Sequence, residues 1–204
     1  MENERSDEFA VPRMPLPQTL QVLVRLRKDD QIVVTSMGTA REWPRQSDHA
    51  LDFHYVPSTM SGAVPLALGL ALAQPQREVL VCSGDGSLLM SLGCLVTAVD
   101  SGVRNLTVAL FDNGVYEITG GQRTAAAQAE VNFSGLAQAA GFPNVAQFWD
   151  LADWRSRAAQ VLALPGPRFL WLQVEPEHDD YLLDPPCPMQ EQLERLRTSL
   201  QRKS

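Results

Sequence analysis

The sequence predicts an α/β protein, a three-layer doubly wound parallel sheet with helices on both faces. Two observations lead to this fold class. Segments with helical spacing of apolar residues alternate along the chain with short apolar segments bounded by glycine or polar residues. The short segments are apolar throughout and not at every second position, which is typical of strands that are buried on both faces.

The first elements follow in order from these patterns. Residues 16–28 have apolar residues at helical spacing and a basic end, so we expect a helix. A strand at 31–36 and a small-residue turn, MGTA, come next. Residues 41–57 are polar and aromatic and predict a long connection, a kind of segment that is often functional. Residues 59–75 predict an apolar helix that is buried on most sides.

The later elements continue the alternation. Residues 87–102 predict a helix that ends at Gly102, and residues 132–142 a helix capped by Asn or Ser. The remaining expected elements are strands at 78–83, 105–113 and 168–176 and helices at 150–164 and 189–204, the last of them amphipathic.

Length and composition limit the organisation and the partners. The 204 residues fit one domain at 16–180, with a flexible leader at 1–15 and a tail with a helix at 181–204. A net charge of −7 argues against nucleic acid or an anionic membrane as the main partner. No apolar run reaches the roughly 18 residues of a membrane span, and the charged start has no signal core, so we expect a cytoplasmic protein.

The three cysteines, Cys82, Cys94 and Cys187, are few and widely spaced. Their odd number argues against a disulfide framework and against a four-cysteine metal or iron–sulfur site within this chain. We expect two buried apolar cysteines and one in a loop.

Three loops follow the carboxyl ends of expected strands, at 36–40, 84–87 and 112–117. Ligands of parallel sheets bind at those ends. If the three strands are neighbours, the loops converge on one site.

The second of these loops contains Gly84-Asp85-Gly86. The glycines permit a close backbone approach, and a helix that starts at Ser87 would point its amino end, an anion site, at the same place. Asp85 beside a phosphate makes sense only with a cation between them, and Mg²⁺ combines carboxylates with phosphate oxygens. The turn therefore suggests a Mg²⁺-diphosphate site, although a bare Gly-Asp-Gly is also a common turn.

The third loop supplies further candidate ligands at a suitable spacing. Asn113 falls at the end of the next expected strand, and its amide oxygen would be a second metal ligand. Gly114 frees the backbone, so that the carbonyl of Val115 would be a third.

These stretches together resemble a known family. GDGSLLM followed by LFDNGVY is similar to the motif of thiamine diphosphate-dependent enzymes, and STMSGAVPLALGLALAQPQREVLVCSGDGS is similar to the segment that precedes it in acetolactate synthases and 2-oxo acid decarboxylases. The resemblance covers about residues 20–175. The ending DNGVYEITGGQRT is most like phosphonopyruvate decarboxylase and the beta subunit of sulfopyruvate decarboxylase. Glu117 departs from the Gly that many relatives have there.

The resemblance implies roles for ten residues toward thiamine diphosphate and Mg²⁺. The side chains of Asp85 and Asn113 and the carbonyl of Val115 would bind the metal. The glycines of the turn and Ser87 would hold the diphosphate, with Gly38 and Thr39 on its other side. Met60 would support the bend between the two rings, although an ordinary core methionine is the alternative. The Ser58 carbonyl and the Met60 backbone amide would bind the edge of the pyrimidine ring. The full set of cofactor-binding candidates is Gly38, Thr39, Ser58, Met60, Gly84, Asp85, Gly86, Ser87, Asn113 and Val115.

The resemblance also implies a function and a partner. It implies non-oxidative decarboxylation of a 2-oxo acid through the thiazolium ylid, for which the cofactor is the electron sink. The glutamate that activates the cofactor lies, in the family, on a pyrimidine-binding domain that this sequence does not resemble. We therefore expect a hetero-oligomeric lyase, with a separate pyrimidine-binding subunit and the cofactor between the two chains.

Catalytic candidates on this chain are weak. His54, just before the Met60 segment, and Glu117 are the two that we consider; Arg123 would meet an anionic substrate group if it is not an ordinary surface arginine. We expect His49 and His178 to be structural or surface residues, and Glu42 and Glu78 to be surface or loop residues.

Two alternative functions remain open. One is the corresponding half of another thiamine-dependent lyase or carboligase, such as an acetolactate synthase. The other is a non-catalytic regulatory or assembly subunit, against which the presence of both Asp85 and Asn113 argues. A subunit of a 2-oxo acid:ferredoxin oxidoreductase is disfavoured by the few cysteines.

Overall fold

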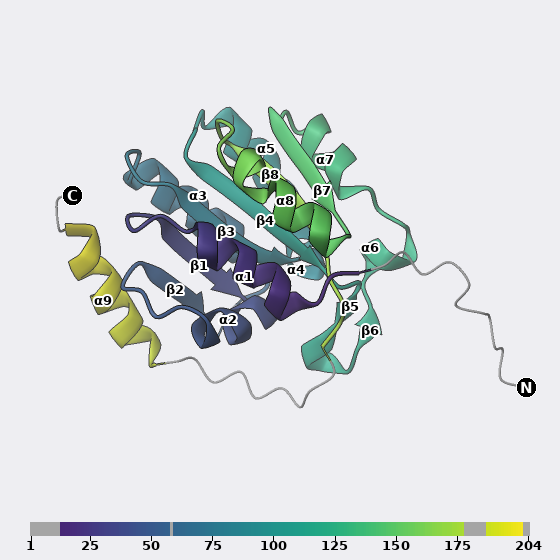
Figure 1. Ribbon diagram of the computed structural model, residues 1–204, viewed down its shortest axis with the longest axis horizontal. Helices are drawn as coiled ribbons and strands as arrows, with labels where there is room; N and C mark the ends of the chain where they lie inside the picture. Colours follow the sequence, from purple (N-terminus) through teal and green to yellow (C-terminus); the bar gives the residue numbers. More distant parts are fainter. Residues whose placement is uncertain (1–12, 58, 178–186, 202–204) are drawn as a thin grey trace, which may run out of the picture.

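The computed structural model describes residues 13–57, 59–177 and 187–201. Its centre is a six-stranded sheet of order β2-β1-β3-β4-β8-β7, parallel throughout (Figure 1). The strands are β1 (Ile32–Ser36), β2 (Asp52–Tyr55), β3 (Val79–Gly84), β4 (Leu106–Asp112), β7 (Asn144–Phe148) and β8 (Arg168–Gln173). The predicted α/β fold with a parallel sheet is confirmed.

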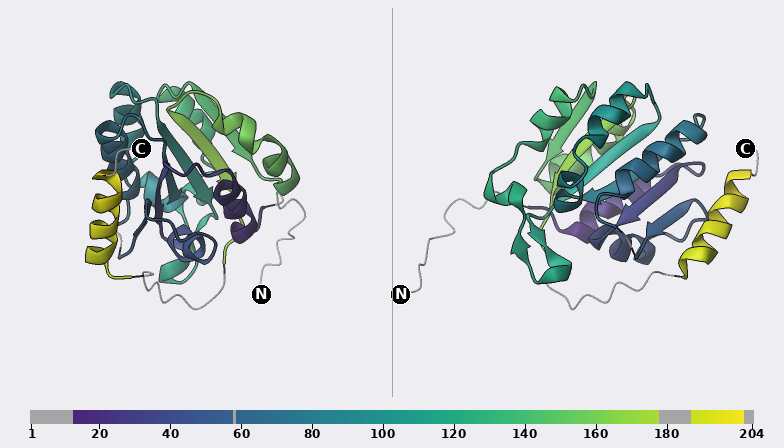
Figure 2. Two further views of the ribbon diagram at one scale, coloured as in Figure 1. Left: turned by 60° about the vertical axis from the view of Figure 1, so that its left-hand side comes forward. Right: turned by 180° about the vertical axis from the view of Figure 1, so that it is seen from behind.

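Helices cover both faces of this sheet, as the views in Figure 2 show. One face carries α1 (Leu16–Leu26) and α8 (Leu151–Leu162), and the other α3 (Ala63–Ala73), α5 (Cys94–Asp100) and α7 (Phe133–Ala139). Each strand sends alternate side chains to each layer: Val34, Val81 and Val108 pack into one core, and Val33, Leu80 and Ala109 into the other. This two-sided burial explains why the strands are continuous apolar runs.

The shorter elements lie mainly at the carboxyl edge of the sheet. They are α2 (Gly38–Glu42), η1 (Trp43–Arg45), α4 (Asp85–Leu89), β5 (Val115–Tyr116), η2 (Glu117–Thr119), β6 (Gln122–Arg123) and α6 (Ala125–Gln128). Strands β5 and β6 pair as a separate antiparallel hairpin. No helix of the described residues has the length and apolar character that a membrane crossing requires.

Several sequence predictions were wrong in detail. The MGTA turn begins the helix α2, and the connection at 41–57 contains η1 and β2. The helix expected at 87–102 is two helices, α4 and α5, separated by residues 90–93. The helix α3 is less enclosed than expected, because Leu72 on its outer face is 54% exposed. Of the expected leader at 1–15, residues 1–12 lie outside the described residues, whereas Met14 is buried and pairs with Val174 beside β8.

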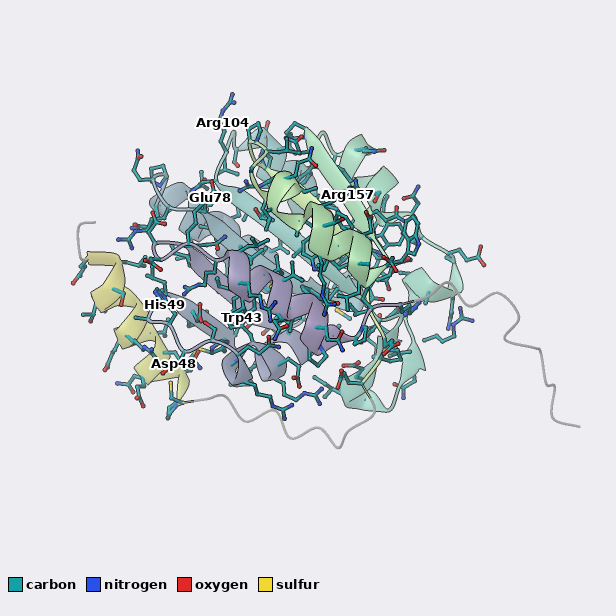
Figure 3. All side chains as sticks on the ribbon, in the orientation of Figure 1. Trp43, Asp48, His49, Glu78, Arg104 and Arg157 are labelled. Atoms are coloured by element: carbon teal, nitrogen blue, oxygen red, sulfur yellow. The ribbon has the colours of Figure 1, made fainter. Side chains whose placement is uncertain are left out.

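The expected amphipathic tail helix is present as α9 (Met189–Gln201), and it packs against the edge strand β2. Leu196 reaches the core, and the buried Gln192 accepts a hydrogen bond from the backbone N–H of His54 at 2.9 Å. Arg195 pairs with Asp48, which lies beside α9 in Figure 3. The helix therefore covers an edge of the sheet.

The buried side chain of His54 is expected to make the free energy of unfolding depend on pH. Its ring is buried and shares a hydrogen bond of 2.8 Å with the Thr35 hydroxyl. Burial is the main cause that lowers the pKa of His54 from 6.5, with Arg195 acting in the same direction and Asp52 and Asp48 opposing it. The unfolded chain then binds the proton more readily, so His54 costs stability as the pH falls below 6.5. Denaturant titrations at pH 7.5 and 5.5 measure the free energy of unfolding. Between these pH values it is expected to fall less for His54→Asn than for the wild type, and an equal fall in both would contradict this.

Gly166 and Gly69 provide a matched pair of glycine substitutions. A Cβ on Gly166 would lie 2.5 Å from the carbonyl oxygen of Arg104, which is backbone and cannot turn away, whereas one on Gly69 meets nothing within 4 Å. We expect Gly166→Ala to destabilise the chain by about 2 kcal/mol or more and Gly69→Ala to stabilise it by about 0.5–1 kcal/mol. Thermal unfolding of both variants tests this, and a loss of equal size in both would be the contrary result.

Candidate functional site

The three loops that the sequence placed at strand ends do converge. Strands β1, β3 and β4 are direct neighbours, and the residues that follow them line one cavity of about 370 Å³. The rest of its described wall comes mainly from residues 115–119, from Val174 and Glu175 just after β8, and from Leu16, Val56, Pro57 and Met60. Of the ten predicted cofactor-binding residues, Ser58 lies outside the described residues. The other nine line the cavity: Gly38, Thr39, Met60, Gly84, Asp85, Gly86, Ser87, Asn113 and Val115.

The Gly-Asp-Gly turn joins β3 to α4. The helix begins at Asp85, earlier than the predicted Ser87, and ends at Leu89. Gly84 is extended, with φ −84° and ψ 157°. Gly86 lies directly under the ring of Tyr116, since a Cβ there would approach Tyr116 Cε1 to 2.3 Å. A larger residue at position 86 would therefore require the ring of Tyr116 to move.

Asp85 is a buried carboxylate, with 2% of its surface exposed. Its Oδ2 accepts a hydrogen bond of 2.7 Å from the hydroxyl of Thr124. Burial and, second, the negative charge of Asp112 raise the pKa of Asp85 to about 6, while the bond from Thr124 opposes the shift. Among the described residues Asp85 has no ion-pair partner within 4 Å.

Asp112 places a second buried carboxylate near Asp85. Its Oδ2 accepts from the indole N–H of Trp171 at 2.9 Å. Burial raises the pKa of Asp112, and the bond from Trp171 and the charge of Arg13 oppose that rise. Two buried carboxylates that repel each other create a strong demand for a cation.

Asn113 begins a tight turn at the end of β4. Its Oδ1 accepts from the backbone N–H of Val115 at 3.0 Å, and Gly114 has φ +73°. The carbonyl of Gly114 accepts from the N–H of Thr124 at 2.9 Å. This turn brings the Asn113 amide and the Val115 residue to the same cavity wall.

The hydroxyl groups at the cavity fix the neighbouring loops. The hydroxyl of Thr39 donates to the carbonyl of Ser36 at 2.7 Å, at the start of α2. The hydroxyl oxygen of Ser87 accepts from the backbone N–H of Ser61 at 2.9 Å and so holds the Met60 segment beside α4. Direct contacts of these two side chains with a ligand remain a prediction.

Of the catalytic candidates on this chain, only Glu117 lies at the cavity. Glu117 lines the cavity, and its Oε1 accepts from the backbone N–H of Glu177 at 2.8 Å. His54 lies in β2, bonded to Thr35, and is absent from the residues that line the cavity. Arg123 is exposed and donates to the carbonyl of Ala127.

The other singled-out residues lie away from the cavity. Glu42 is buried and paired with Arg41 and Arg45, so the expectation of a surface residue was wrong. Glu78 pairs with Arg168 at the opposite end of β3 (Figure 3). All three cysteines are free, with Cys82 buried. His178 lies outside the described residues.

The residues present fit a diphosphate and a divalent cation. No group of three or more His, Cys, Asp or Glu side chains in the described part of the chain is arranged to hold a metal by itself. One carboxylate, one amide oxygen and one carbonyl, all oxygen ligands, suit Mg²⁺ that takes its remaining ligands from phosphate and water. The uncompensated charge of buried Asp85 and the side-chain-free surface at Gly84 support the same fit.

Sequence reasoning missed three contributors to this site. Thr124 and Tyr116 contact Asp85 and Gly86, and a Cβ on Gly114 would lie 3.3 Å from a guanidinium nitrogen of Arg13. Thr124 and Arg13 are far from their partners in sequence. The position of Tyr116 next to the Asn113 turn was the one available signal.

Comparisons with known proteins identify the family. The family model described as "Thiamine pyrophosphate enzyme, C-terminal TPP binding domain" matches residues 33–171. Phosphonopyruvate decarboxylase of Streptomyces viridochromogenes is 35% identical over 177 residues, which are 87% of this chain and 44% of that protein. Sulfopyruvate decarboxylase subunit beta of Methanothermobacter thermautotrophicus is 38% identical over 153 residues, 74% of this chain and 78% of that subunit.

A solved structure shows the same fold. The thiamine diphosphate-dependent 4-hydroxybenzoylformate decarboxylase of Rhodococcus jostii superposes with a TM-score of 0.68 at 21% identity. The superposition covers 88% of this chain and 36% of that one. The chain thus spans less than half of the Streptomyces and Rhodococcus enzymes, and most of the Methanothermobacter subunit.

Proposed function

Because this chain belongs to the thiamine pyrophosphate enzymes, with their C-terminal cofactor-binding domain, we propose that it is the diphosphate-binding half of a 2-oxo acid decarboxylase. One observation carries the proposal: nine residues that the family motif assigns to the cofactor line a single cavity at the carboxyl edge of the sheet. The relatives named above include decarboxylases of phosphonopyruvate and sulfopyruvate, which makes a 2-oxo acid the substrate class to test first.

Each side of the cavity has a distinct role in this proposal. Asp85 and Asn113 bind Mg²⁺ through side-chain oxygens, with the carbonyl of Val115 as a third ligand. Gly84 and Gly86 let the backbone approach the diphosphate, and Gly38 and Thr39 bind its far side. Thiamine diphosphate supplies the electron sink for decarboxylation. The chain itself positions the cofactor: Met60 supports it, and Phe111 and Val174 form an apolar wall that excludes water.

We further propose that a second polypeptide completes the site. The carboxylates that this chain contributes to the described wall are Asp85, Glu117 and Glu175. Asp85 is assigned to the metal, Glu117 is held by the backbone N–H of Glu177, and Glu175 is exposed. The activating glutamate for the pyrimidine ring then comes from a pyrimidine-binding subunit, an arrangement that agrees with the "subunit beta" in the name of the Methanothermobacter relative.

The test is to purify the tagged full-length chain from its native host and identify what accompanies it. Mass spectrometry for a second chain, together with thiamine diphosphate and Mg²⁺ content, addresses the assembly. Release of CO₂ from pyruvate, sulfopyruvate and phosphonopyruvate addresses the reaction, and product analysis separates a decarboxylase from a carboligase. A complex that binds no cofactor and releases no CO₂ would contradict the proposal and favour a scaffold role.

A further inference from the structure

Thr124 stands at the junction of the two metal-binding loops of the proposed site. It follows the β5–β6 hairpin, is fully buried with 0% of its surface exposed, and forms the N-cap of α6 by accepting from the backbone N–H of Ala127. Its hydroxyl donates to Asp85 Oδ2 at 2.7 Å, and its own backbone N–H donates to the carbonyl of Gly114 at 2.9 Å. One residue thus joins both loops.

The three bonds of Thr124 are directional and mutually compatible. The hydroxyl has one proton, which goes to Asp85, and it accepts from Ala127 at 3.2 Å. Since α6 fixes the hydroxyl position, the carboxylate of Asp85 is held in one orientation, with Oδ2 already bonded. The link to Gly114 keeps the Asn113 turn at a fixed distance from that carboxylate.

We propose that Thr124 is a positioning residue of the metal site, which keeps Asp85 as a single-oxygen ligand and holds it in register with the Asn113 turn. This inference rests on the proposed function and adds how the site selects its cation. Mg²⁺ requires near-octahedral, single-oxygen coordination, whereas Ca²⁺ accepts a carboxylate through both oxygens. With Oδ2 engaged by Thr124, the site favours Mg²⁺.

The size of the effect follows from known outer-shell partners. Loss of a hydrogen bond that orients a metal ligand typically reduces metal affinity about 10–100-fold. Thr124→Val removes the hydroxyl at nearly constant volume, while Thr124→Ser keeps it. Thr19→Val is a control, since Thr19 is also fully buried, donates to the carbonyl of Pro15, and neither residue lines the cavity.

The experiment titrates Mg²⁺, and separately Ca²⁺, into the full-length chain with thiamine diphosphate, by calorimetry and tryptophan fluorescence. It uses the purified complex if the partner accompanies the chain. For Thr124→Val we expect Mg²⁺ affinity to fall about tenfold or more and the preference to shift toward Ca²⁺. Thr124→Ser and Thr19→Val are both expected to retain the Mg²⁺ affinity and the metal preference of the wild type. Circular dichroism confirms that each variant is folded.

The outcomes separate this inference from the proposed function. A wild type that binds Mg²⁺ with thiamine diphosphate, together with an equally tight Thr124→Val variant of unchanged metal preference, overturns the role of Thr124 alone. A folded wild type that binds neither Mg²⁺ nor thiamine diphosphate overturns both the role of Thr124 and the proposed function. Weakened Mg²⁺ binding in Thr19→Val as well would assign the effect to general destabilisation and also overturn the inference.

Discussion

Asp85→Ala is expected to weaken the Mg²⁺-dependent binding of thiamine diphosphate by roughly 100-fold or more. It is also expected to reduce decarboxylation by the complex to background. In the proposed function Asp85 is the carboxylate that binds the metal, and it lies in the cavity wall with 2% of its surface exposed. Calorimetric titration of cofactor and metal measures the first effect and CO₂ release the second. Retained activity would support the scaffold alternative.

The buried carboxylate of Asp85 is also expected to lower the free energy of unfolding of the cofactor-free chain. Because burial raises the pKa of Asp85 from 3.8 to about 6, its ionised form is disfavoured in the fold at pH 7.5. Asp85→Asn therefore raises the free energy of unfolding there, by at most about 3 kcal/mol, and the gain shrinks as the pH falls through 6 toward 3.8. The exposed Asp100→Asn at the end of α5 is the control and is expected to have little effect at any pH.

Gly86→Ala is expected to damage the site through Tyr116. The added Cβ would lie 2.3 Å from Cε1, 3.0 Å from Cδ1 and 3.1 Å from Cζ of that ring, so the ring must move. Overpacking of this kind costs about 1–3 kcal/mol. Since Tyr116 is part of the cavity wall and of the β5–β6 hairpin, we expect both a lower melting temperature and a cofactor affinity about tenfold or more weaker.

Two further variants make this test specific. Gly93→Ala is the control, because a Cβ there meets nothing within 4 Å and φ is −58°. The double variant Gly86→Ala/Tyr116→Leu removes the ring that the methyl group meets and is expected to recover part of the lost stability. If Gly86→Ala binds cofactor as tightly as Gly93→Ala does, the close contact with Tyr116 is unimportant for the site.

The elements that could be predicted are those whose own sequence has a recognisable pattern. Strands β1, β3 and β4 are continuous apolar runs, and the loops after them carry the motif, so both could be found from the sequence. Strand β2 lacks such a run because Asp52 and His54 are polar. Their burial depends on distant partners: Trp43 and Arg27 for the carboxylate, and Gln192 for the backbone of His54.

The rest of the site depended on contacts between segments far apart in the chain. Thr124 is 39 positions from Asp85, and its sequence surroundings give no sign of their hydrogen bond. The break between α4 and α5 was hidden because the apolar pattern continues through residues 90–93. There the hydroxyl of Ser91 donates to the carbonyl of Ser61, which belongs to the segment before α3.

The C-terminal helix determines how this chain can associate with other strands. The backbone N–H of His54 is bonded to Gln192, and that of Asp52 to the carbonyl of His49, so at these positions β2 has no free donor for an added strand. Of the two edges of the sheet, β2 and β7, the first is closed by α9. Edge-to-edge growth into a continuous multimolecular sheet is thereby stopped on that side. The helix α9 thus protects the chain against aggregation through this edge of the sheet.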